Sequence, residues 1–93
     1  MRVGVCQIEI FIDHSFSLKD KRRVVNSIKN RIKNRFNVSI IETGTGTNRK
    51  KTTIGLSCVG IDENSVRNLL NQIVSFLEED DRLEITDLSA EIY

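Results

Sequence analysis

Apolar and polar residues alternate along residues 2–13, which is typical of a β-strand with one buried face. Alternation returns over 37–43 and 52–61, and the polar, glycine-containing stretch 44–51 between them predicts a hairpin. Residues 83–93 alternate again, with a phase change near Asp87 that predicts a β-bulge. The pattern predicts four strands. The first would bury Cys6, Ile8, Ile10 and Ile12 and turn Val5, Gln7, Glu9 and Phe11 outward.

Two segments show helical spacing instead. Ser17 precedes Asp20 by three residues, like the two ends of a capping box, and predicts the start of a helix over 18–36. Asp62 can cap a second helix. The expected buried stripes are Leu18, Val25, Ile28, Ile32 and Phe36 in the first helix, and Val66, Leu69, Leu70, Ile73, Phe76 and Leu77 in the second.

The resulting order, βαββαβ, predicts a ferredoxin-like α+β fold. Right-handed crossovers place the strands in the order 4-1-3-2, all antiparallel, with both helices on one face. At 93 residues the chain suits a single domain spanning 1–93. We expect no transmembrane segment or signal peptide, and therefore a cytoplasmic protein. The two cysteines, Cys6 and Cys58, lie singly in apolar segments, so we expect reduced, buried thiols.

Charge divides the chain into two halves. Residues 1–51 hold twelve Lys or Arg against four acids, whereas residues 52–93 hold two against nine, so the overall charge of +1 conceals a strong asymmetry. In the predicted fold the first helix lies beside strands 2 and 3 and the second beside strands 1 and 4. The basic and acidic halves should therefore form opposite flanks, which favours a binding function.

Three segments carry a resemblance to a known family. SLKDKRRVV at 17–25, RFNVSIIE at 35–42 and the closing Glu91-Ile92 resemble the YlxP-like family of small bacterial proteins of uncharacterised function. The resemblance implies a ferredoxin-like fold, a genomic association with transcription and translation factors, and no established biochemical activity. The chain departs from the family pattern at 47–52, where TNRKKT lacks the tryptophan and alanine usual there.

Basic residues of the first helix form the main candidate site. Lys19, Arg22, Asn26, Lys29 and Lys33 follow helical spacing along one stripe without interleaved acids, as a surface for polyanions would. Arg23 adds a cation on the far flank, and the predicted hairpin tip adds three more. A solvated helix face is the alternative. The candidate RNA-binding residues are Lys19, Arg22, Arg23, Lys29, Lys33, Arg49, Lys50 and Lys51.

The hairpin tip 44–51 combines glycines with cations and could fold over phosphates. It is not a Walker loop, because it lacks the Gly-Lys-Ser/Thr ending and joins two strands; a flexible tip is the simpler interpretation. Base stacking of the RNA-recognition-motif type is not expected, because the third strand has no aromatic residue. The open sheet face, with Val5, Phe11, Ile41 and Val59, could form a homodimer interface, although scattered exposed apolar residues are ordinary.

Catalysis and metal binding find little support. His14 lies beside Asp13, Ser15 and Ser17, but neighbours in a short turn rarely orient a nucleophile toward its base. No cofactor, metal or small-molecule ligand is expected. The sequence thus favours a non-enzymatic cytoplasmic module that binds RNA or ribosome-associated partners through the basic flank. The alternative is a protein-interaction or self-assembly module that uses complementary charged flanks and the open sheet face.

Overall fold

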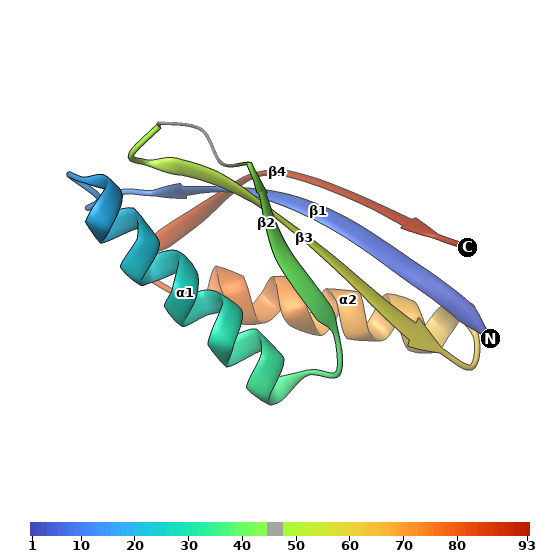
Figure 1. Ribbon diagram of the computed structural model, residues 1–93. Coiled ribbons are helices and arrows are strands. Elements are labelled where there is room, and N and C mark those ends of the chain that lie inside the picture. Colours follow the sequence, from blue (N-terminus) through green and yellow to red (C-terminus); the bar gives the residue numbers. More distant parts are fainter. Residues whose placement is uncertain (45–47) are drawn as a thin grey trace.

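The computed structural model describes residues 1–44 and 48–93. It has two layers, a four-stranded sheet and two helices on one face of it (Figure 1). The strands lie in the order β2-β3-β1-β4 and each neighbouring pair is antiparallel, which confirms the predicted ferredoxin-like fold and strand order. The elements are β1 (Arg2–Ile12), α1 (Leu18–Arg35), β2 (Ser39–Gly44), β3 (Lys51–Gly60), α2 (Glu63–Glu78) and β4 (Leu83–Ile92).

The core lies between the sheet and the helices. The central strands β1 and β3 supply most of its sheet side, and every second residue of each is buried. α2 closes the core over β1 and β4 while α1 covers the β2 side (Figure 1). The basic helix α1 with β2 and the acidic elements α2 with β4 therefore lie on opposite flanks, although β1 of the basic half lies between β3 and β4. The core cluster comprises Cys6, Ile8, Ile10, Ile28, Ile32, Ile40, Ile54, Leu56, Cys58, Val66, Leu70, Ile73 and Leu77.

Both helices begin where their capping residues predict. The Ser17 side chain accepts a hydrogen bond from the Asp20 amide at 3.1 Å, and Asp62 accepts one from the Ser65 amide at 2.8 Å. Leu18, expected in the buried stripe of α1, is instead 49% exposed. Lys21 takes the core-facing position of the first turn, because it continues the i, i+4, i+7 spacing of the buried residues that follow it.

Two irregularities interrupt the sheet. Pairing between β1 and β4 shifts from Glu9 with Asp87 to Ile10 with Ile85, which leaves Thr86 as the extra residue and confirms the bulge predicted there. Pairing between β2 and β3 also shifts, at Thr43, where no bulge was predicted. β2 and β4 are the edge strands. None of the ten residues of β4 is buried, and three of them are acids: Glu84, Asp87 and Glu91.

α2 approaches the sheet most closely near its start. A Cβ atom added to Gly4 would overlap Cγ1 of Val66, and one added to Gly60 would lie 2.9 Å from Cγ2 of the same side chain. Val66 is fully buried. The absence of a side chain at these two glycines therefore allows α2 to pack against the ends of β1 and β3. Among the residues that the structure describes, no helix is long and apolar enough to cross a membrane.

Candidate nucleic-acid interface

The packing of α1 determines where its cations point. Arg31 lies 3.9 Å from the carboxylate of Asp80, and the Arg35 guanidinium carbon lies 5.3 Å from the ring centre of Phe76, so these two arginines face α2. Helical geometry puts four other cations on the opposite side of α1, away from α2. We name these four the α1 stripe; it runs about 21 Å along the helix and consists of Lys19, Arg22, Lys29 and Lys33.

The α1 stripe has no acidic partners in the described part of the chain. None of its four cations forms an ion pair with another described residue, and neither does Arg23, which is exposed. Three members of the stripe are exposed and Lys29 is half-buried. In contrast, Arg31 and Arg82 both pair with Asp80. The stripe therefore offers charge that the fold itself does not neutralise.

The β2–β3 hairpin is fastened to the start of α1. The Lys21 ammonium donates hydrogen bonds to the backbone oxygens of Asn48, at 2.8 Å, and Lys51, at 3.3 Å. The hydroxyl of Ser15, which is 1% exposed, donates to the backbone oxygen of Arg49. Residues 45–47 of the predicted tip lie outside the described residues. The described part of the hairpin end lies beside the first turn of α1 (Figure 1).

Three consecutive cations, Arg49, Lys50 and Lys51, form what we call the tip cluster. Arg49 Nη1 donates to the backbone oxygen of Phe16 at 3.3 Å. The Lys50 ammonium lies 5.3 Å from the ring centre of Phe16 and 6.0 Å from that of Phe11, and donates to the Asp13 backbone oxygen at 3.4 Å. Lys51 lies on the open sheet face, 3.9 Å from Glu9. The tip cluster thus lies against the β1–α1 turn and the end of the open face.

These residues enclose a hollow of about 390 Å³, which we call the tip cleft. In the tip cleft the candidate cations of the hairpin lie beside two aromatic rings, those of Phe11 and Phe16. The residues that line it are Phe11, Ser15, Phe16, Asn48, Arg49, Lys50 and Lys51.

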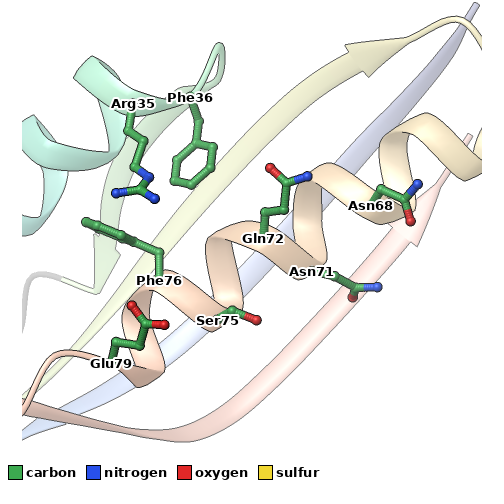
Figure 2. A pocket seen from close by; sticks show the side chains of 8 residues that line it. All are labelled: Arg35, Phe36, Asn68, Asn71, Gln72, Ser75, Phe76 and Glu79. Carbon is green, nitrogen blue, oxygen red and sulfur yellow. The ribbon is translucent and has the colours of Figure 1, made fainter.

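A larger hollow, of about 560 Å³, lies between the end of α1 and the outer face of α2 (Figure 2). Phe36 and Phe76 meet edge to face there, with ring centres 5.9 Å apart, and Arg35 reaches over both rings. The rest of the lining consists of four neutral polar side chains of α2 and one carboxylate: Asn68, Asn71, Gln72, Ser75 and Glu79. This inter-helix groove is rich in hydrogen-bonding groups, but it lies at the opposite end of α1 from the tip cluster, and the sequence analysis did not identify it.

The acidic flank contains a local ion-pair network at the α2–β4 turn. Arg82 contacts Asp80 at 2.7 Å and donates to Ser27 of α1 at 3.3 Å, so the turn is linked to α1. Hydrogen bonds from the Arg82 side chain hold the pKa of Asp80 below its usual value despite partial burial. The network pairs both Arg31 and Arg82 with the single carboxylate of Asp80 and does not include the α1 stripe.

The four apolar residues expected on the open sheet face do not form one patch. Val5 is 43% exposed and Val59 is 58% exposed, near the same end of the sheet. Phe11 lies six positions further along β1, about 20 Å away, where it contacts Lys50 and is half-buried. Ile41 is exposed on the edge strand β2. The apolar surface is therefore distributed over the face.

The short turn around His14 arranges its hydroxyls for structural contacts. His14 is exposed and its nearest acid is the adjacent Asp13, at 4.0 Å. The Ser15 hydroxyl donates to backbone oxygens, and the Ser17 hydroxyl caps α1. Across residues 1–44 and 48–93, no cluster of His, Cys, Asp and Glu has the form of a metal site. Cys6 and Cys58 are buried free thiols.

The sequence did not identify two residues of this region as part of the site, although it predicted that the start of α1 and the hairpin tip lie at the same end of the sheet. Phe16 is 68% exposed beside the tip cluster, and Lys21 is only 6% exposed and holds the hairpin. The sequence contained a pattern that could have identified both residues. An apolar residue just before an N-cap usually packs against the fourth helical residue, and here that residue is Lys21 rather than an apolar one. Phe16 therefore lacked its usual partner.

Comparisons with known proteins place the chain in a family. Residues 3–90 match the family described as "Protein of unknown function (DUF503)". The uncharacterized protein YlxP of Bacillus subtilis (strain 168) is 31% identical over 84 residues, which cover 90% of this chain and 91% of that protein. A de novo designed protein, Foldit4, shares the fold with a TM-score of 0.55 at 15% identity, over 98% of this chain and 96% of the other. The chain thus belongs to the DUF503 family of small YlxP-like proteins.

Proposed function

We propose that this protein is a cytoplasmic, non-enzymatic module that binds RNA, free or in the ribosome, through its basic flank. The observation that carries the proposal is the α1 stripe, whose cations have no acidic partner in the described part of the chain. Four cations along about 21 Å of helix can each contact a phosphate, and released counterions would drive binding. The buried free thiols suit a reducing compartment.

The affinity of the basic flank for RNA should depend on the charge and shape of the RNA more than on its base sequence. Lysine and arginine side chains on an exposed helix face position a nucleic-acid backbone without reporting its sequence. β3 presents no aromatic side chain to the open sheet face, so stacking across the sheet is not part of the proposal. Structured RNAs of different sequence should therefore bind with similar affinity.

Titration of RNA at several salt concentrations tests this proposal. If the α1 stripe and the tip cluster contact about four to six phosphates, the log-log salt slope should be roughly −3 to −5. The double variant Lys29→Glu/Lys33→Glu should bind far more weakly and keep its stability within about 0.5 kcal/mol per site. Failure of the wild type to bind RNA even at low salt would disprove the proposal.

Arg67→Glu provides a charge-matched control for a single reversal at Lys33. Arg67 is also an exposed helical cation, but it lies on α2 in the acidic half and pairs with Glu63 at 3.6 Å. Lys33→Glu and Arg67→Glu change the net charge equally. If RNA affinity depended only on net charge, both would weaken it alike; a basic-flank interface predicts a much larger loss for Lys33→Glu.

The separation of charge also favours a second candidate, association between copies of the chain or with a charged protein. The acidic residues of α2 and β4 lie on the flank opposite the α1 stripe, so two copies could pair head to tail. The open sheet face, with Val5 and Val59 exposed, could extend such a contact. Light scattering decides: salt-sensitive self-association that Lys29→Glu/Lys33→Glu abolishes would support this candidate.

A further inference from the structure

Phe16 is an exposed aromatic residue whose backbone is held on both sides. Its amide donates to the carboxylate of Asp20 at 3.2 Å, and its carbonyl oxygen accepts from Arg49 at 3.3 Å. The residue is nevertheless 68% exposed. A ring presented to solvent from a fixed backbone loses little conformational freedom when it binds a partner.

The surroundings of Phe16 are cationic. The Lys50 ammonium lies within 5.3 Å of its ring centre, and Arg49 reaches its carbonyl oxygen. Phe11 forms the other apolar side of the tip cleft, 6.0 Å from the same ammonium. The volume of about 390 Å³ lies in the range of sites for small organic ligands, so the cleft can hold more than a phosphate ion.

The walls of the tip cleft are tied together. Asn48 Oδ1 accepts hydrogen bonds from the amides of Lys50, at 2.9 Å, and Lys51, at 3.1 Å, which fixes this end of the hairpin. Lys21 and Ser15 connect the hairpin to the start of α1. The cations and the ring are therefore positioned before any ligand arrives.

We propose that the tip cleft binds one unpaired nucleotide of an RNA strand. Its base would stack on the free side of the Phe16 ring, and its phosphate would contact Arg49 and Lys50. An aromatic platform beside backbone-binding cations is the arrangement by which proteins hold single strands. The inference rests on the proposed RNA binding and adds to it: the α1 stripe holds the backbone, and the tip cleft selects RNA with an unpaired base.

Phe16→Leu is the discriminating variant, because it keeps an apolar side chain and removes the aromatic face. Two labelled probes of equal length are compared at one salt concentration, a single-stranded oligoribonucleotide and a blunt RNA duplex. Loss of one stacked base should weaken single-strand binding about 5- to 150-fold and leave duplex binding unchanged. Lys33→Glu, the matched variant on the α1 stripe, should weaken both.

The outcomes separate this inference from the proposed function. If the wild type binds neither probe, both are overturned. If it binds RNA but Phe16→Leu weakens neither probe, or weakens both equally, the inference is overturned while the proposed function stands. Circular dichroism and urea unfolding of Phe16→Leu confirm that the exposed substitution leaves the fold intact.

A mononucleotide titration followed by NMR tests the base contact directly. Adenosine monophosphate should shift the ring signals of Phe16 and the side-chain signals of Arg49, whereas inorganic phosphate should shift only the cations. If the nucleotide and inorganic phosphate gave identical shifts, the cleft would be a phosphate site without base stacking, and the inference would fail.

Discussion

The ammonium of Lys21 lies 2.8 Å from the backbone oxygen of Asn48, 27 residues further along the chain. The lysine is 6% exposed and also donates to the backbone oxygen of Lys51 at 3.3 Å. A charged side chain thus occupies a core-facing position of α1, and its ammonium group binds backbone oxygens of the hairpin. This contact sets the tip cluster beside the α1 stripe.

Lys21→Met should destabilise the protein. Methionine keeps the apolar stem but cannot donate to the hairpin carbonyls, so we expect the free energy of unfolding to fall by about 1–3 kcal/mol. Lys19→Met, an exposed change in the same helical turn, should cost less than about 0.5 kcal/mol. Urea unfolding of both variants measures the difference; equal losses would show that the hairpin contact contributes nothing to stability.

Gly4→Ala should also destabilise the fold, through Val66. The added methyl group would overlap Val66 Cγ1 and force α2 away from β1, at a cost of about 1–3 kcal/mol. In the background of Val66→Ala the same substitution should cost less, because the clashing group is gone. A double-mutant cycle in urea tests this coupling, and additive losses would contradict the proposed clash.

The two thiols should react slowly in the native state. Burial raises the pKa of both Cys6 and Cys58, so at pH 8 fewer of them are thiolates than in an unfolded chain. Labelling with a thiol-specific disulfide reagent should be far slower in buffer than in denaturing urea. Rapid native labelling of both residues would be inconsistent with the register that pairs Gly4 with Cys58 and Cys6 with Leu56.

Asp80→Asn should lower stability in a pH-dependent way. The Arg82 hydrogen bonds depress the pKa of Asp80 in the folded state. The stability that ionised Asp80 contributes is therefore complete above the unfolded pKa of about 3.9, and it is lost as pH falls through the folded pKa. We expect a loss of about 1 kcal/mol at pH 7, reduced by solvent screening. The difference in the free energy of unfolding between Asp80→Asn and the wild type, measured by urea unfolding, should shrink below pH 4. Asp81→Asn, an exposed neighbour, provides the control.

Local periodicity was sufficient to predict the fold. Alternation along β1 and the capping signals at Ser17 and Asp62 act over a few residues and can be recognised in the sequence. The bulge at Thr86 was visible for the same reason, since it breaks the alternation of β4. The shift at Thr43 was not, because it falls at the last residues of a six-residue strand, where alternation has too few positions to reveal a break.

The candidate site was only partly predictable. Helical spacing located the α1 stripe, because its members lie within one element. The contacts of Lys21 with Asn48 and of Arg49 with Phe16 join residues 27 and 33 positions apart, and no local pattern reports which side chains meet across such distances. Phe16 was therefore overlooked, although its missing apolar partner at Lys21 was present in the sequence.

The acids of the exposed edge strand β4 have a practical consequence for handling the protein. The outer edge of this ten-residue strand is a template on which a second copy could extend the sheet into an aggregate. At neutral pH, Glu84, Asp87 and Glu91 would confront the same carboxylates of an approaching β4, and their repulsion opposes that growth. Concentrated samples of the protein should therefore remain clear at neutral pH.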